Sequence, residues 1–222
     1  MIIKLLQGLT PYQTTVDIMQ SIVTDMINKK KTNTALLVEH HPIYTVGYTT
    51  YEECINKYGN KIMIDGKVVD ILKSERGGKL TYHGPGQRVC YLLIDLKELY
   101  NYINLQLFLN DIHSVIINSL KFFNIDGIRE REYPGIWIQN GYKLSKIAAI
   151  GIKIKSGISY HGIAININTD MRYFESIIPC GIADSARGVT SLQELLGYKI
   201  DMNLFDQVLK SELIRFFYIK GL

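Results

Sequence analysis

The chain has 222 residues, of which 47% are hydrophobic and 21% are charged, a composition that excludes a disordered protein. At roughly 150 residues per domain, this length predicts one domain over residues 1–222. No apolar run approaches the ~18 residues that a membrane helix needs, and the apolar block at residues 1–6 is too short for a signal peptide. We therefore expect a cytoplasmic protein that does not act in a membrane.

Charge and cysteine content argue against nucleic-acid binding, a disulfide framework and a zinc site. Lys and Arg number 25 against 21 Asp and Glu, a net charge of +4, and the densest basic run is Lys29-Lys30-Lys31. That run follows a predicted helix, whose C-terminal dipole it suits, so a nucleic-acid partner is not expected. The three cysteines, Cys54, Cys90 and Cys180, form no CxxC pair, which argues against a disulfide framework and against a zinc site.

The hydrophobic pattern predicts helices and strands in chain order. Apolar residues recur at helical spacing after Thr10-Pro11, again over 105–123, and a third time after Asp201. Short apolar or alternating runs predict strands at 35–38, 89–94, 136–138, 143–155 and 158–168. Asn140-Gly141 and Ser156-Gly157 predict two successive hairpins. The fold class is α+β (mixed α/β), with a mostly antiparallel sheet covered by helices from both ends of the chain.

A glycine-rich segment at residues 76–87 is the first candidate site. Its composition argues against a regular element, and Leu80 stands where a P-loop needs Ser or Thr after Gly-Lys. The segment is either an ordinary surface loop or a substrate-lining loop, in which Thr81, Tyr82 and His83 lie where a ligand can approach the backbone.

The histidines suggest metal binding only weakly. Residues 39–42 read Glu-His-His-Pro, typical of a strand end before a turn. His40 and His41 are adjacent, and adjacent side chains on a strand point to opposite faces. We expect no metal site there, and His113 is interpreted as a boundary residue on a helix.

Lys146 and Cys180 are the candidate catalytic residues. Lys146 has the same strand parity as Ala148, Ile150 and Ile152, so an unbroken pleat would direct its ammonium to an apolar face; the alternative is a lysine that snorkels to water. Cys180 lies between Pro179 and Gly181, where a thiol has no packing role. A nearby lysine would stabilise its reactive thiolate.

These pieces together resemble the lipoyl(octanoyl) transferases, or lipoate-protein ligase B family. The resemblance spans about residues 36 to 197, most of the chain. The matching segments, in order, are 39–47, 76–87, 134–137, 146–151, 161–166, 179–182 and 188–192.

The resemblance implies the fold of the biotin and lipoate ligases and transfer of an octanoyl group without a cofactor. The donor would be octanoyl-acyl carrier protein; the acceptors would be apo-lipoyl domains of 2-oxoacid dehydrogenase complexes and the glycine cleavage H protein. Cys180 would carry the acyl group as a thioester, and Lys146 would stabilise the thiolate and relay protons. The residues implied to bind the acyl chain are Arg76, Gly77, Gly78, Lys79, Leu80, Thr81, Tyr82, His83, Ala149, Ile150, Gly151, Gly162, Ile163 and Ala164.

Two stretches depart from the family pattern, and both are predicted to be surface loops. Residues 57–75 are longer and more basic than usual, and residues 184–187 add a residue or two.

Two other functions stay open. An ATP-dependent lipoate or biotin ligase would release pyrophosphate, whereas a module that only binds lipoyl domains or carrier protein would leave Cys180 and Lys146 unexplained.

Overall fold

The computed structural model describes residues 1–130, 133–177 and 187–217. Its main sheet has the strand order β1-β2-β7-β11-β10-β9-β8, and β12 pairs with β10 off this path. Most neighbours are antiparallel, but β1 with β2 and β10 with β12 are parallel. The strands are β1 (Ile2–Thr10), β2 (Thr34–His40), β7 (Gln87–Leu93), β8 (Ile128–Arg129), β9 (Ile136–Asn140), β10 (Lys143–Lys155), β11 (Ile158–Asn166) and β12 (Arg187–Val189).

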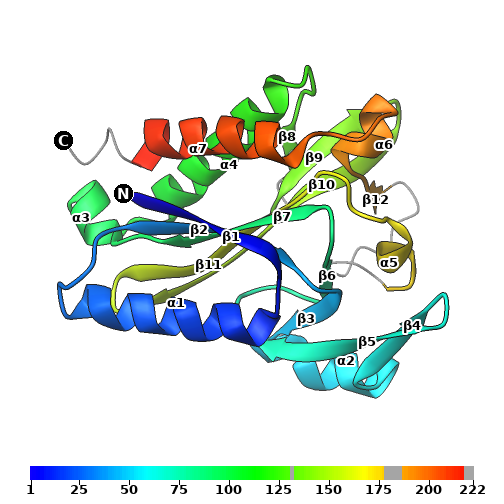
Figure 1. The fold of residues 1–222 in the computed structure, drawn as a ribbon, viewed down its shortest axis with the longest axis horizontal. Helices are drawn as coiled ribbons and strands as arrows, with labels where there is room; N and C mark the ends of the chain where they lie inside the picture. The colour runs from blue at the N-terminus through cyan, green and yellow to red at the C-terminus, as the bar shows by residue number, and fades with distance from the viewer. Residues whose placement is uncertain (131–132, 178–186, 218–222) are drawn as a thin grey trace.

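Helices cover both faces of this sheet (Figure 1). Helix α1 (Tyr12–Ile27) packs on one face, while α4 (Leu105–Lys121) and α7 (Met202–Phe217) pack together on the other. Three short helices, α3 (Leu96–Tyr100), α5 (Arg172–Glu175) and α6 (Leu192–Leu196), lie in the connections. The sheet therefore has a core on each face, and the two cores share its alternating side chains.

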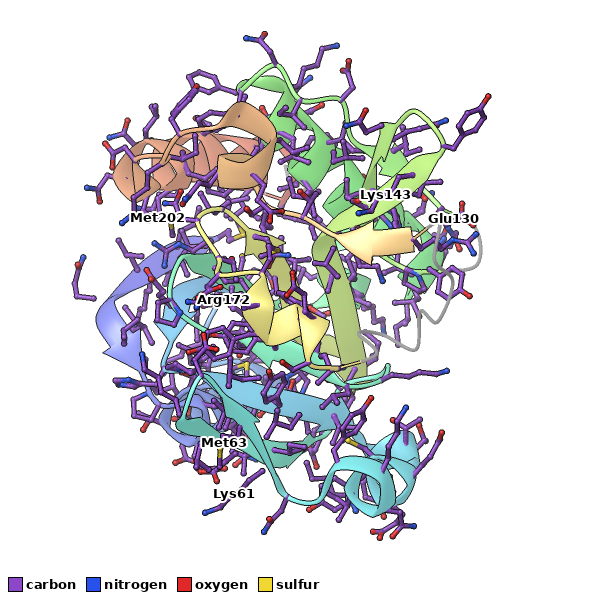
Figure 2. The ribbon with its side chains drawn as sticks, turned by 90° about the vertical axis from the view of Figure 1, so that its right-hand side faces the viewer. Lys61, Met63, Glu130, Lys143, Arg172 and Met202 are labelled. Atoms are coloured by element: carbon purple, nitrogen blue, oxygen red, sulfur yellow. The ribbon has the colours of Figure 1, made fainter. Side chains whose placement is uncertain are left out.

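A smaller sheet lies beside the end of α1 (Figure 1). Its order is β4-β5-β3-β6, formed by β3 (Ile43–Gly47), β4 (Lys61–Ile64), β5 (Lys67–Ser74) and β6 (Thr81–His83). Between β3 and β4 lie η1 (Tyr48–Thr50) and α2 (Tyr51–Tyr58). Figure 2 shows Arg172 on α5 between the main sheet and the β4–β5 hairpin, whose strand β4 carries Lys61 and Met63. Arg172 pairs with Asp65 in the turn of that hairpin.

The elements with strong periodicity are confirmed, and so is the mixed α/β class. Both predicted hairpins are present, since β9 and β11 pair antiparallel with β10. Two expectations were wrong. Residues 57–75 are not a loop but mostly the hairpin of β4 and β5, and residues 81–83 form strand β6 inside the glycine-rich segment. In both places the strand is stabilised by backbone hydrogen bonds to β3, and the local sequence alone does not predict this pairing.

A buried ion pair joins the main sheet to the last helix. Both Nε and a terminal guanidinium nitrogen of Arg88 on β7 donate to the carboxylate of Asp206 on α7, at 2.7 and 2.9 Å. The two residues are 4% and 2% exposed, so neither charge is shared with bulk water. The pair therefore fixes where α7 docks on the sheet. In the described part of the chain, no helix is both long and apolar enough to cross a bilayer.

Candidate active site

A cavity of about 300 Å³ lies between the main sheet and the loop that follows β5. The exposed residues Gly77, Gly78, Lys79 and Pro134 form the solvent-facing part of its lining. The floor is formed by β10 and β11, where glycine and alanine alternate with isoleucine. The floor residues are Ala149, Ile150, Gly151, Gly162, Ile163 and Ala164, and the buried walls are formed by Tyr12, Thr81, His83, Val89, Tyr91, Lys146 and His161.

This cavity brings together predicted acyl-binding residues that are far apart in the sequence. All of them line it except Leu80 and Tyr82. Those two side chains are buried in the core of the smaller sheet, where the Tyr82 ring stacks on Tyr173 at 4.4 Å. Alternate residues of an extended segment point to opposite sides, so Thr81 and His83 face the cavity while Leu80 and Tyr82 face the core.

Arg76 builds the loop wall of the cavity. Its guanidinium donates to the backbone oxygens of Thr45 and Lys79, at 2.6 and 2.9 Å, and to the Thr45 hydroxyl. Its alkyl chain covers Gly151, where an added Cβ would approach the Arg76 Cδ to 2.9 Å. Arg76 therefore holds the loop in place over the small residues of the floor.

Gly47 on β3 fixes the other side of the same loop. Its amide donates to the carbonyl of Gly78 at 3.1 Å. An added Cβ at this position would collide with that same carbonyl oxygen. Because the collision is with backbone, no rotamer change relieves it, and only glycine allows the loop to sit this close to β3.

Lys146 is buried, at 4% exposure, which excludes the snorkelling alternative. Its ammonium lies 4.8 Å from the centre of the Trp137 ring on β9. Among the described residues it has no carboxylate partner within ion-pair distance. A cation with an aromatic face but no counter-ion is available to bind an anion in the cavity.

The strand-parity argument for Lys146 was wrong, although its side chain is buried as that argument required. Lys146 pairs with Trp137, but Ala148 pairs with Ile136, so Ile147 is an extra residue in β10. This bulge reverses the alternation. Ala148, Ile150 and Ile152 face the core beneath α4 and α7, whereas Lys146 faces the opposite side with Trp137.

A cluster of rings closes the inner end of the cavity. His40 makes ring contacts with Tyr12, His83 and Tyr91 at 5.5 to 5.9 Å. The Tyr91 hydroxyl lies 2.8 Å from Nε2 of His40, whose Nδ1 lies 2.9 Å from the backbone oxygen of Thr10. Because a carbonyl only accepts, Nδ1 of His40 carries the proton, and the Tyr91 hydroxyl donates to Nε2.

Hydrogen bonds fix the tautomer of His83 as well. The Gln87 amide nitrogen donates to the backbone oxygen of Tyr82 and to the side chain of Asn166, which in turn donates to the backbone oxygen of Thr190. The Gln87 oxygen must therefore accept from Nδ1 of His83, at 2.7 Å. Nε2 of His83 is left as an unprotonated acceptor.

Burial keeps all three histidines neutral. It lowers the pKa of His40 to about 4 and that of His83 to about 3. The pKa of His161 falls to about 3 through burial and the nearby charges of Arg76 and Lys153. The inner end of the cavity is thus polar but uncharged at neutral pH.

Several cavity residues were missed by sequence reasoning. Tyr12, Tyr91 and Tyr133 had no signal beyond their aromatic character, because only the tertiary fold brings them to the cavity. His161 and Pro134 lie inside matched segments, so their positions beside Gly162 and Gly135 were the available clue. Cys180 falls outside the described residues. Within the described ranges, no group of three or more His, Cys, Asp or Glu side chains could hold a metal ion.

Comparison with known proteins identifies the family. The family model described as the lipoyl protein ligase A/B catalytic domain matches residues 11–214. The chain belongs to this family. It is 38% identical to an octanoyltransferase of Rickettsia prowazekii, over 96% of this chain and 97% of that protein. It is also 38% identical to an octanoyltransferase of Orientia tsutsugamushi, strain Ikeda, over 90% and 91% of the two chains.

Solved structures agree on the fold. A bipartite lipoate protein ligase from Thermoplasma acidophilum superposes with a TM-score of 0.65 at 16% identity, covering 98% of this chain and 83% of that one. Biotin protein ligase from Aquifex aeolicus gives 0.56 at 14% identity, covering 98% and 70%. The expected biotin and lipoate ligase fold is therefore confirmed. As a member of the lipoyl protein ligase A/B family related to octanoyltransferases, the chain is a transferase of lipoyl or octanoyl groups.

Proposed function

We propose that this enzyme transfers an octanoyl group from octanoyl-acyl carrier protein to a lysine of apo-lipoyl domains, through a thioester on Cys180. The observation that carries the proposal is the buried ammonium of Lys146, which opens onto an acyl-sized cavity without a carboxylate partner among the described residues. Residues 1–222 would form one cytoplasmic catalytic domain.

The cavity suits an alkyl chain. Its volume of about 300 Å³ lies at the lower end of the range for small-molecule sites. Val89 and Ala164 supply apolar wall, and Gly151 and Gly162 line the cavity with backbone. Each methylene that leaves water contributes about 0.8 kcal/mol, so a chain that fills the cavity gains most of its binding energy there.

In the first step, the Cys180 thiolate attacks the thioester carbonyl of the donor. A new carbon–sulfur bond forms and the carrier thiolate leaves. Lys146 gives that thiolate a proton and becomes a neutral amine. Because one thioester replaces another of similar energy, this step requires no ATP.

In the second step, the amine of the acceptor lysine attacks the acyl-enzyme. The amide bond forms, the bond to Cys180 breaks, and Lys146 takes the proton that the amine loses. The thiolate and the ammonium are thereby restored. The amide is more stable than the thioester, which makes the second step effectively irreversible.

The acceptors we propose are the lipoyl domains of 2-oxoacid dehydrogenase complexes and the glycine cleavage H protein. The Thermoplasma ligase that shares this fold is described together with its E2 lipoyl domain. That likeness supports a lipoyl domain as the acceptor of this chain.

The direct test is the intact mass of an apo-lipoyl domain after incubation with octanoyl-acyl carrier protein and this enzyme, without ATP. We expect the mass of one octanoyl group to be added. With the carrier protein alone, the enzyme should form an adduct that hydroxylamine removes. Transfer that proceeds only with ATP and a free acid would favour a ligase instead.

Matched cysteine variants localise the adduct. Cys180→Ser should abolish it. Cys90→Ser and Cys54→Ser should retain it, because both thiols are buried and burial raises the pKa of each. An adduct that persists in Cys180→Ser would contradict the proposed nucleophile.

A further inference from the structure

His161 has a backbone conformation that side chains rarely adopt. Its φ is +65°, in the left-handed region. Along β11, Ile163 and Ile165 face the core beneath α4 and α7, whereas Tyr160 and Ala164 face α1. Regular alternation would put His161 with the isoleucines. Its left-handed backbone turns the ring to the opposite face, where it lines the cavity.

No structural hydrogen bond explains this placement. His161 is 3% exposed, and its Nε2 has no hydrogen-bond partner within the described residues. The ring is held by contacts with Tyr160 at 4.5 Å and Tyr91 at 6.3 Å. An unpartnered buried nitrogen and a strained backbone both cost stability. Because no hydrogen bond to a described residue compensates the strained backbone, we take the place of the ring in the cavity as a sign of a steric role toward the occupant.

The position of His161 defines one end of that cavity. On the neighbouring strand it pairs with Ile152, and the carbonyl of Ile152 lies 3.6 Å from where a Cβ on Gly77 would stand. The Arg76–Gly77 loop therefore covers this end. Lys146 lies six residues earlier on β10, roughly 20 Å of strand away. Both side chains line the cavity, whose floor residues Ala149, Ile150 and Gly151 lie between these two positions on β10.

We propose that the His161 ring is the end stop of the acyl pocket and sets the longest chain that the enzyme accepts. This inference rests on the proposed function, because it places the thioester beside Lys146 and the methyl end beside His161. A chain of eight carbons ends at the imidazole. A longer chain meets the ring edge, which cannot move aside because Tyr91 and Tyr160 hold it and its backbone is fixed in the sheet.

Two substitutions remove the stop while suiting the backbone. His161→Gly relieves the left-handed strain and deletes the ring. His161→Asn tolerates the same conformation and keeps a shorter polar group. Both variants should fold, which melting temperature verifies. His113→Ala is the matched control, since His113 is half-buried on α4 and does not line the cavity.

The first measurement is calorimetric binding of octanoate, decanoate and dodecanoate to the full chain. Each extra buried methylene is worth about a fourfold gain in affinity. In His161→Gly, the ratio of decanoate to octanoate affinity should therefore rise roughly 15-fold above that of the unsubstituted enzyme. His161→Asn should show a smaller rise, and His113→Ala none. An unchanged ratio in His161→Gly would overturn the proposal.

The second measurement separates this inference from the proposed reaction. Octanoyl transfer by the unsubstituted enzyme tests the reaction alone. If transfer fails but His161→Gly still shifts the affinity ratio, the end stop stands and the reaction does not. If transfer succeeds and decanoyl transfer by His161→Gly does not rise relative to octanoyl transfer, His161 is not the stop.

Discussion

The ammonium of Lys146 lies 4.8 Å from the centre of the Trp137 ring, and the two residues are directly paired across β10 and β9. The ring faces the ammonium from the neighbouring strand, so Lys146 is held at the cavity by an aromatic face and not by a carboxylate. This arrangement leaves its charge uncompensated by any described acid. Such a cation can stabilise an anion that enters the site.

The first prediction concerns the charge of Lys146. If it stabilises the Cys180 thiolate, Lys146→Ala should move iodoacetamide alkylation of Cys180 to higher pH and slow octanoyl transfer at least a hundredfold. Lys146→Arg keeps the charge but does not release its proton at neutral pH, so alkylation should be largely retained while transfer is lost. Unchanged alkylation and turnover in Lys146→Ala would reduce Lys146 to a strand residue.

The second prediction concerns Trp137. Replacing its fully buried ring in Trp137→Leu should lower the free energy of unfolding by about 2–4 kcal/mol, because the smaller side chain leaves a cavity. It should also slow transfer more than Trp137→Phe does, because Phe keeps an aromatic face toward the ammonium. Urea denaturation and octanoyl transfer at saturating donor measure the two effects. Equal transfer rates for the two variants would mean that the ring serves packing only.

The third prediction concerns Gly47. In Gly47→Ala, the added methyl pushes the Gly78 carbonyl away from β3 and displaces the cavity loop. We expect KM for the octanoyl donor to rise roughly tenfold or more. Gly66→Ala is the control, because Gly66 lies in the β4–β5 turn of the smaller sheet and an added Cβ there meets nothing within 4 Å. Its own left-handed φ of +77° will cost stability, so the readout that separates the variants is KM and not melting temperature.

The fourth prediction is a pH dependence of stability. Histidine in the unfolded chain titrates near pH 6.5, whereas burial lowers the pKa of His83 and His161 to about 3 and that of His40 to about 4. Below pH 6.5 the unfolded chain binds protons that the folded chain does not. Stability is therefore full above pH 6.5 and falls toward pH 4, by up to about 1.4 kcal/mol per pH unit for each histidine.

The variant His83→Gln isolates the contribution of His83 to this pH dependence of stability. Guanidinium unfolding at several pH values between 4 and 7 gives the free energy of unfolding at each pH. This free energy should fall less steeply with decreasing pH in the variant than in the unsubstituted enzyme, by the slope that one proton contributes. Parallel curves would show that His83 is protonated in the folded state, against the neutral imidazole that burial favours.

The fifth prediction concerns the buried pair of Arg88 and Asp206. Asp206→Asn leaves the Arg88 charge without its counter-ion and should destabilise the fold by about 3–5 kcal/mol. The double substitution Arg88→Met with Asp206→Leu removes both charges and should recover much of that loss. Thermal unfolding compares the single and double variants. A double variant that is less stable than Asp206→Asn would show that the pair contributes net stability of its own.

Sequence reasoning succeeded where local pattern and tertiary structure agree. The two hairpins around β10 follow from Asn140-Gly141 and Ser156-Gly157, and α1, α4 and α7 follow from apolar spacing. It failed at the smaller sheet, since β6 has only three residues and is stabilised by pairing with β3. A short strand carries too little periodicity to be seen before its partner is known.

The cavity shows the same division. The sequence motifs predicted most residues of its loop and floor. The side of the sheet to which Lys146 points depends on the extra residue Ile147 in β10, which the sequence pattern does not predict. The left-handed backbone at His161 could not be predicted either, because this conformation is expected at glycine and not at histidine. The ring cluster of Tyr12, His40 and Tyr91 is assembled by three separate elements. It could be found only once the fold was known.

The strand order also determines when the enzyme can acquire activity as it is made. Strand β7 lies inside the main sheet between β2 and β11, which lie some fifty residues before it and seventy after it in the sequence. The floor of the cavity therefore does not exist until residue 166 has been synthesised, and Asn166 finds its Thr190 partner later still. Such non-local pairing slows folding and leaves unpaired strand edges on the growing chain. For this enzyme, the active site therefore forms late, because its floor depends on strands that are far apart in the chain.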